Sequence, residues 1–304
     1  MNPFIISKKV KTALEKQDAL VALESTLITH GLPQPTNFET AWEMEQNVEM
    51  EGATAATICM FHGKFHVGLT KDQLKVLADI ENPIKISRKD IAYAITKKAD
   101  GGTTVSGTME AAHACGLRVF ATGGIGGVHR GHFADTSADL PTLAEIPMIV
   151  VCSGAKAILD MSATKEKLET YGVPVLGYQT NELPAFYSIH SGIAVDRRVD
   201  SPSEIAEIAL AQWEFGLRSA LLVTVPVPAE AEIPAEDVDG AINEALDEAH
   251  RLGIQGPATT PFLLEKVAAI TEGRSMSANL ALLKQNARVA GKIAKALADL
   301  SKDR

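Results

Sequence analysis

Lys156 is the residue whose surroundings most favour covalent chemistry. It follows apolar and small residues in the segment VVCSGAK, and Ala157 and Ile158 come next. An apolar environment disfavours the charged form of a lysine and so lowers its pKa. A neutral lysine amine can attack a carbonyl-type carbon. Asp160 stands four residues further on, where a helix would bring it within reach of an ion pair, and the pattern alone favours that ion pair.

Glu24 offers a carboxyl group at the end of a second apolar run, LVAL, and is followed by Ser25 and Thr26. A partly buried carboxyl with a raised pKa is a natural general acid. A carboxylate at this position can equally cap a neighbouring helix. The residue types leave both interpretations open.

A glycine-rich segment, ATGGIGGVHRG, carries four glycines between positions 123 and 127. Glycines let the backbone approach a ligand closely and turn its N–H groups toward an anion. The spacing fits neither GxGxxG nor the Walker lysine loop, so it gives little support to dinucleotide or nucleoside triphosphate binding. We interpret the segment as a phosphate or ligand contact, in preference to a tight strand exit alone. His129 and Arg130 follow it and could add positive charge.

Two aspartates, Asp135 and Asp139, flank Ser137 in the segment DTSADL. Carboxylates and hydroxyls suit a hard divalent cation that keeps part of its water shell. Asp and Ser are also favoured in turns and helix caps, and spacing alone slightly favours that structural role.

Other polar side chains give weaker signals. Lys85 lies in IKISRKD with two further basic residues, and we expect one or two of the three to face solvent. His30, His62 and His66 have no convincing ligand spacing, so we expect structural roles for them.

The polar clusters follow strands that alternate with helices, a pattern typical of βαβ units and a mainly parallel sheet. Ligands of open α/β sheets gather outside the carboxyl ends of the strands, so the clusters are expected to meet there. We predict a single domain over residues 1–304, folded as a three-layer α/β/α sandwich with a mainly parallel central sheet. Strands are expected at 20–23, 55–59, 84–87, 117–124, 147–154, 173–180 and 219–228, with a hairpin around Gly63. Helices are expected at 7–17, 36–50, 71–79, 89–98, 108–115, 157–172, 242–252, 262–271 and 278–300, the second opened by a capping box of Thr36 and Glu39.

Composition is ordinary for a soluble globular protein, since 46% of the 304 residues are hydrophobic and 22% are charged. A net charge of −9 disfavours a whole-surface nucleic-acid binder, which would normally be basic. Three cysteines without CxxC spacing indicate reduced thiols in a cytosol, in preference to a disulfide framework or a zinc site. No apolar run approaches a membrane span, and the first residues do not read as a secretory signal. We therefore expect a cytoplasmic protein that binds a small molecule, no nucleic acid polymer and no membrane.

Taken together, the segments resemble the pseudouridine-5′-phosphate glycosidase family, also called the indigoidine synthase A-like family. ALEST, GGIGGVHRG and CSGAK in combination are highly specific for this family, unlike any single glycine cluster. The matching stretches follow the family's order across nearly the whole chain. They are VALESTLITHGLPQP, ATIC with KFHVGLT, IKISRKD, GGTTV, VFATGGIGGVHRG, DTSADL, VVCSGAKAILD, GVPVLGYQT with LPAFY, and TPFLLEKVAAIT.

The resemblance implies an enzyme with an α/β/α core, assembled as a homotrimer, that reversibly cleaves the C–C glycosidic bond of pseudouridine 5′-phosphate. The implied products are uracil and ribose 5-phosphate, and a divalent metal, typically Mn²⁺, assists. The family's nucleophilic lysine falls on Lys156, its proton-donating glutamate on Glu24 and its metal-binding aspartate on Asp135. Its substrate-binding positions fall on Lys85, Val105, the segment Ser137, Ala138 and Asp139, and Asn279, to which we add the neighbouring Thr104 and His129.

A C–C glycosidic bond has no leaving oxygen or nitrogen to protonate, so the paired-carboxylate route of ordinary glycosidases is insufficient. The hypothesis is that Glu24 protonates the ribose ring oxygen, Lys156 adds at C1′, and protonation of uracil at C5 breaks the C–C bond. Glycine-loop N–H groups, with Lys85 or His129, would hold the phosphate. Two alternatives stay open: a Schiff-base lyase or aldolase acting on another sugar phosphate, and a non-enzymatic sugar-phosphate sensor.

Overall fold

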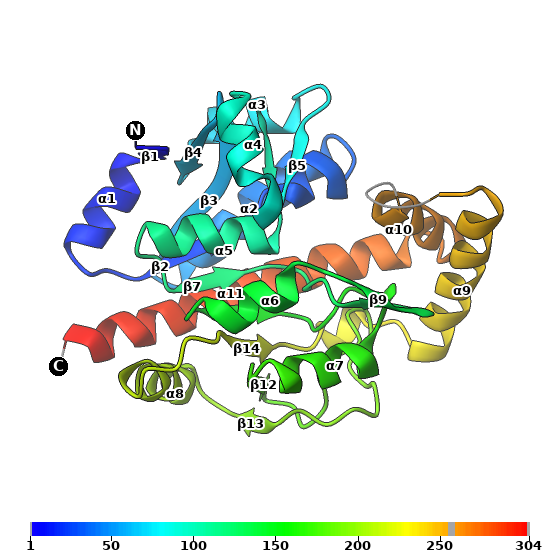
Figure 1. Cartoon of the computed structure of the whole chain (residues 1–304). Coiled ribbons are helices and arrows are strands. Elements are labelled where there is room, and N and C mark those ends of the chain that lie inside the picture. Colours follow the sequence, from blue (N-terminus) through cyan, green and yellow to red (C-terminus); the bar gives the residue numbers. More distant parts are fainter. Residues whose placement is uncertain (1, 255–258, 303–304) are drawn as a thin grey trace.

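A central sheet organises the computed structural model, which describes residues 2–254 and 259–302 (Figure 1). Its middle strands all run parallel, in the order β3-β2-β7-β10-β14-β12-β13. β4 and β6 pair with β3 in the antiparallel sense, and they join β1 and β5 to the same edge. The strands of this sheet are β1 (Phe4–Ile6), β2 (Leu20–Leu23), β3 (Thr54–Phe61), β4 (Lys64–Val67), β5 (Ile84–Ile86), β6 (Gly101–Thr103), β7 (Val119–Ala121), β10 (Ile149–Cys152), β12 (Val175–Tyr178), β13 (Arg197–Val199) and β14 (Leu221–Thr224).

Helices cover both faces of the sheet, which confirms the predicted α/β/α sandwich (Figure 1). α2, α8 and α11 pack together on one face, and α5, α6 and α7 follow one another on the other face. A small antiparallel sheet of β8 (Val128–His129), β9 (His132–Thr136) and β11 (Leu159–Asp160) stands outside the main sheet. The helices are α1 (Lys8–Glu15), α2 (Thr36–Met50), α3 (Lys71–Ala78), α4 (Ile91–Thr96), α5 (Val105–Ala114), α6 (Asp139–Glu145), α7 (Met161–Thr170), α8 (Pro202–Glu214), α9 (Ala235–Arg251), α10 (Thr259–Ile270) and α11 (Arg274–Lys302).

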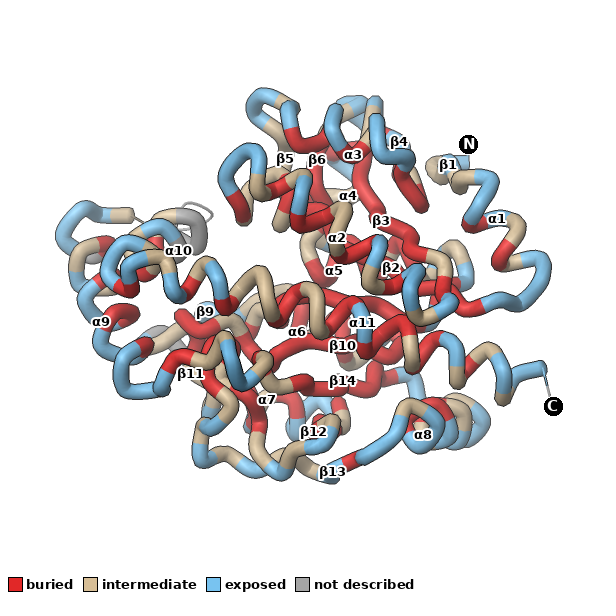
Figure 2. The backbone as a smooth tube through the Cα atoms, turned by 180° about the vertical axis from the view of Figure 1, so that it is seen from behind, coloured by how far each residue is buried: buried red, intermediate tan, exposed pale blue. Residues whose placement is uncertain are grey.

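The central strands form where the sequence has continuous apolar runs. All four residues of β2, β10 and β14 are buried, as expected for parallel strands covered on both faces. Figure 2 shows the buried stretches concentrated on these strands and the exposed ones on the outer turns of the helices. α11 packs closely against α2, because a Cβ at Gly291 would lie 3.1 Å from the carbonyl oxygen of Val48 in α2.

Several helix starts differ from the prediction because local caps decide them. The helix predicted from 157 begins only at Met161, since Asp160 caps α7 by accepting a hydrogen bond from the N–H of Ala163 at 2.9 Å. The helix predicted from 108 begins at Val105, where Thr104 is the capping residue. α2 has the predicted bounds but no side-chain cap, so the capping-box prediction at its start is wrong.

Several elements went unpredicted, most of them short. They are β1, β6, β8, β9, β11, β13, α6 and α8. None of the described helices combines the length and apolarity needed to span a bilayer.

Candidate active site

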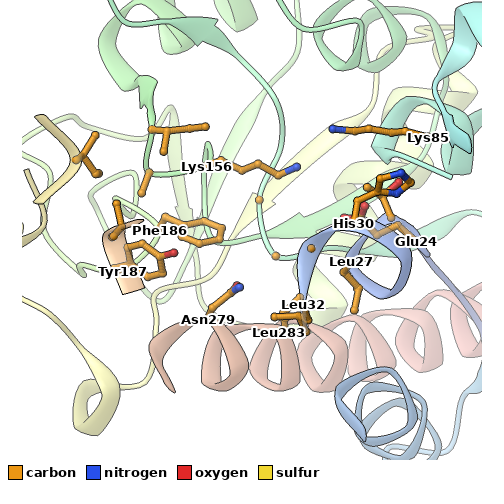
Figure 3. A pocket seen from close by; sticks show the side chains of 18 residues that line it. Glu24, Leu27, His30, Leu32, Lys85, Lys156, Phe186, Tyr187, Asn279 and Leu283 are labelled. Carbon is orange, nitrogen blue, oxygen red and sulfur yellow. The ribbon is translucent and has the colours of Figure 1, made fainter. Parts of the chain in front are cut away.

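A cavity opens where the carboxyl ends of β2, β7 and β10 meet (Figure 3). Glu24, Lys85, Lys156 and Asn279, which come from four separate segments of the sequence, all line it. Figure 3 shows the two lysine side chains reaching toward one another from opposite sides, with Glu24 below Lys85 and Asn279 on the far wall. The expected convergence of polar strand ends is present for Glu24 and Lys156, which follow β2 and β10, whereas Lys85 lies within β5 and Asn279 in α11.

Glu24 directly follows β2 and is only 6% exposed. Its Oε1 accepts a hydrogen bond from the hydroxyl of Thr122, which follows β7. Burial raises the pKa of the Glu24 carboxyl, while the positive charge of Lys156 and the Thr122 hydrogen bond act in the opposite direction. A carboxyl held in this way retains its proton more readily than a solvated one, as a general acid must.

Lys156 lies in the loop after β10, where its backbone N–H donates to the carbonyl of Ile125 at 3.0 Å. The predicted ion pair with Asp160 is wrong, because Asp160 caps α7 and no salt bridge joins it to Lys156. The amine instead faces the cavity together with Lys85. Burial lowers the pKa of Lys85, and the nearby charge of Lys156 lowers it further.

His30 also lines the cavity. The expectation that it has only a structural role therefore does not describe it fully. It belongs to a π-helical turn, Leu27–Gly31, that follows Glu24 on the same strand exit. Its Nε2 lies 3.2 Å from the carbonyl oxygen of Pro83, and its Nδ1 lies 2.7 Å from the hydroxyl oxygen of Thr29. The carbonyl of Pro83 can only accept, so Nε2 carries a proton, and in the neutral ring Nδ1 accepts the hydroxyl proton of Thr29. Burial and then the charge of Lys85 lower the pKa of His30 in agreement with that state.

The glycine-rich segment divides into two functional halves. Gly123 and Gly124 line the cavity, in keeping with the predicted ligand contact. Gly126 and Gly127 pack against protein instead, since Cβ atoms there would lie 2.2 Å from Ser137 Oγ and 2.3 Å from Thr164 Oγ1.

Arg130 does not direct its charge into the cavity, contrary to the prediction. Its guanidinium donates to the carbonyl oxygens of Ala157 at 3.2 Å and Leu159 at 3.3 Å. It also pairs with Asp239 of α9 at 2.9 Å. Arg130 thus ties the loop after Lys156 to α9.

The remaining predicted substrate positions do not line this cavity. Asp139 is 5% exposed, and its two carboxylate oxygens accept the N–H groups of Ser106 at 3.0 Å and Gly126 at 2.8 Å. Its negative charge still raises the pKa values of Glu24 and Lys85. Other predicted positions that do not line the cavity are Thr104, Val105, His129, Ser137 and Ala138.

The predicted metal ligand, Asp135, is exposed on β9. Within residues 2–254 and 259–302, no three His, Cys, Asp or Glu side chains gather as a metal-binding group. Both carboxylate oxygens of Asp139 already accept a backbone N–H group, which accounts for its burial without a metal. The donors present fit an ion held by one carboxylate and several waters, a mode common for hard divalent cations, and not a protein cage.

A family model described as indigoidine synthase A like protein matches residues 9–296. The chain belongs to the indigoidine synthase A-like family. Among its relatives, a protein of Caldanaerobacter subterraneus named pseudouridine-5′-phosphate glycosidase is 47% identical over the full length of both chains. A protein of the same name from Herpetosiphon aurantiacus is 48% identical, with 98% of this chain and 99% of that one covered.

Solved structures of the indigoidine synthase A-like family share the whole fold. The prealnumycin C-glycosynthase AlnA, in complex with ribulose 5-phosphate, superposes with a TM-score of 0.92 at 38% identity and covers 99% of both chains. An indigoidine synthase A-like protein from Thermotoga maritima superposes with a TM-score of 0.90 at 34% identity, covering 98% of this chain and 97% of that one.

In this member of the indigoidine synthase A-like family, a fully buried asparagine ties the strand ends together. Asn286 of α11 donates from its side-chain amide to the carbonyl oxygen of Thr122 at 2.9 Å. Its amide oxygen accepts the hydroxyl of Ser153, which follows β10, at 3.3 Å. Asn286 could not be predicted from the sequence, because it stands inside a regular helix, far in sequence from both partners. A polar residue on the otherwise apolar face of that helix was the one available signal.

Proposed function

We propose that this protein reversibly cleaves the C–C glycosidic bond of pseudouridine 5′-phosphate to give uracil and ribose 5-phosphate. The observation that carries the proposal is the placing of an acid, Glu24, and an amine, Lys156, in one cavity. The names of two relatives at 47% and 48% identity support the same substrate. A further relative is a C-glycosynthase solved with ribulose 5-phosphate, which supports a sugar phosphate in the cavity.

The proposed reaction opens the ribose before the C–C bond breaks. The Glu24 carboxyl gives its proton to the ring oxygen, and the bond from C1′ to that oxygen breaks as the uracil ring supplies electrons. The amine of Lys156 then adds at C1′ and loses a proton. Uracil takes a proton at C5, the C1′–C5 bond breaks, and its electron pair stays with uracil. The imine left between Lys156 and C1′ is hydrolysed by water, which releases ribose 5-phosphate and restores the amine.

The surrounding charges fit these roles. The raised pKa of Glu24 favours its protonated form, because burial penalises the carboxylate. Lys85 faces Lys156 across the cavity and places a second positive charge there. A phosphate dianion would pair with the ammonium group of Lys85. We therefore assign Lys85 to the phosphate end of the substrate.

A divalent cation, Mn²⁺ in the first place, is proposed to bind at Asp135 with most of its ligands supplied by water. When bound, such an ion supplies coordinated waters that orient the substrate. Homotrimeric assembly and a cytoplasmic location are proposed with the same function, on the basis of the family resemblance. Light scattering of the purified protein tests the trimer, and a monomer at working concentration would contradict it.

Trapping of the imine tests the proposed chemistry directly. Ribose 5-phosphate and borohydride should add one sugar phosphate mass to the wild-type chain, and a peptide map should place it on Lys156. Lys156→Ala should remain unlabelled, whereas Lys97→Ala, which removes an exposed lysine, should label like wild type. Equal labelling of Lys156→Ala would reject the assignment. A parallel assay follows condensation of uracil with ribose 5-phosphate, with and without manganese.

A Schiff-base lyase or aldolase acting on another sugar phosphate is the second candidate. The ribulose 5-phosphate bound to the 38% identical C-glycosynthase favours it, because a ketose can also form an imine with Lys156. Product analysis separates the two functions. Uracil release from pseudouridine 5′-phosphate supports the first, and cleavage of ketose phosphates without a base supports the second.

A further inference from the structure

The cavity has an aromatic wall on the side away from Lys85. Phe186 and Tyr187 both line it, and Figure 3 shows their rings near Lys156, on the side away from Lys85 and Glu24. Their ring centroids lie 4.8 Å apart with the planes at 78°, an edge-to-face contact. The hydroxyl of Tyr187 is hydrogen-bonded to Ser275. The cavity thus has a charged end and an apolar, aromatic end.

Phe186 reaches this wall through an unusual backbone conformation. Its φ is +62°, in the left-handed region that bulky residues rarely enter. The N–H of Phe186 donates to the carbonyl of Ser153 at 3.1 Å, and the N–H of Ala185 donates to the carbonyl of Ser188 at 2.9 Å. Backbone outliers held in place by their surroundings concentrate at functional sites.

Two glycines at the strand ends leave the space that this turn occupies. A Cβ at Gly124 would lie 2.7 Å from Cε2 and 2.8 Å from Cδ2 of the Phe186 ring. A Cβ at Gly154 would lie 2.3 Å from the carbonyl oxygen of Pro184. The loops after β7 and β10, which also carry the cavity-lining residues, are therefore shaped around Phe186.

We propose that Phe186 is the specificity-determining residue for the base, and that its ring supports the planar pyrimidinedione of the substrate. The inference deepens the proposed function, on which it rests. Lys156 must reach C1′, which carries the base on one side and the remainder of the sugar on the other. With the phosphate at the Lys85 end, the base lies toward the aromatic end, where Phe186 offers it an apolar surface.

Binding of an unreactive nucleotide tests this assignment independently of the lysine chemistry. Calorimetry should measure the Kd of uridine 5′-monophosphate, whose N-glycosidic bond replaces the C–C bond, and the Kd of ribose 5-phosphate, which has no base. Loss of a base–aromatic stack weakens binding by about 5- to 150-fold. Leucine retains part of the apolar contact, so Phe186→Leu should weaken uridine 5′-monophosphate binding by about tenfold and leave ribose 5-phosphate binding within twofold.

Phe215→Leu is the matched control, because Phe215 is 83% exposed. This substitution should leave both Kd values unchanged. Gly124→Ala, which pushes on the ring without removing it, should weaken the nucleotide selectively as well. Equal weakening of both ligands in Phe186→Leu would mean that the residue only supports the fold, and unchanged nucleotide binding would mean that it does not contact the base. Either result overturns the proposal. Failure of the borohydride trap alongside selective loss of the nucleotide would reject the imine chemistry and keep the base site.

Discussion

Replacing Asn286 by leucine should destabilise the protein strongly, although it removes no catalytic group. The side chain is fully buried, and leucine fills a similar volume. The substitution leaves two buried groups without this hydrogen-bond partner: the carbonyl of Thr122 and the hydroxyl of Ser153. The carbonyl of Gly123 loses only a weak contact at 3.4 Å and keeps the N–H of Ser153 at 2.8 Å.

Each buried polar group left without a hydrogen-bond partner costs about 1–3 kcal/mol. The free energy of unfolding should therefore fall by about 2–6 kcal/mol. At roughly 2 °C per kcal/mol for a chain of this size, Tm should fall by about 4–12 °C. Thermal unfolding followed by circular dichroism, at fixed protein concentration, measures the change. Asn243→Leu, on the exposed side of α9, is the control and should shift Tm by less than about 2 °C.

A double-mutant cycle sharpens this prediction. Ser153→Ala removes the hydroxyl that Asn286→Leu would leave unpaired. The loss in free energy of unfolding of the double variant should therefore be smaller than the sum of the two single losses by about 1 kcal/mol or more. A Tm loss below about 2 °C in Asn286→Leu would refute the reasoning. Strict additivity of the two losses would refute the pairing of Asn286 with Ser153.

Three further predictions concern the site. Glu24→Gln should slow cleavage of pseudouridine 5′-phosphate by about 10²–10⁴-fold yet still form the Lys156 adduct with ribose 5-phosphate, and wild-type cleavage would remove Glu24 from the mechanism. Thr122→Val removes the hydrogen bond that lowers the pKa of Glu24. The charges of Lys156, Lys85 and Asp139, which also act on Glu24, are unchanged. That pKa should rise, the acid should stay protonated to higher pH, and the descending limb of the pH–rate profile should move upward; a limb that is unmoved or moves down contradicts this. Asp135→Ala should require far more Mn²⁺ for activity and show weaker Mn²⁺ binding by calorimetry, and an unchanged titration would reassign the metal.

Much of the fold could be predicted because apolar runs mark buried parallel strands directly. Leu20–Leu23 has the predicted bounds, and the position of a polar residue after such a run places Glu24 and Lys156 at the same sheet edge. These inferences are local, since each needs only a run and the residue that follows it.

The rest depends on contacts that no local pattern contains. Arg130 follows a glycine-rich segment, as a ligand-binding arginine would, but its partners are two carbonyls and Asp239, which is 109 residues away. Phe186 looks like an ordinary core aromatic in the sequence, and its left-handed backbone arises from the loops packed around it. Asn279 was placed in the site through family resemblance alone.

The last described helix, α11, has a consequence for how the protein is made. It supplies Asn279 and Leu283 to the cavity, and its Asn286 bonds to partners 164 and 133 residues earlier in the chain. A nascent chain on the ribosome therefore carries the acid and the amine long before it has a cavity around them. Until α11 packs against the sheet, the ends of β7 and β10 lack the hydrogen bonds that Asn286 makes to them. We expect a stalled chain that ends before α11 to be devoid of activity, and the site to appear in a single late step of folding.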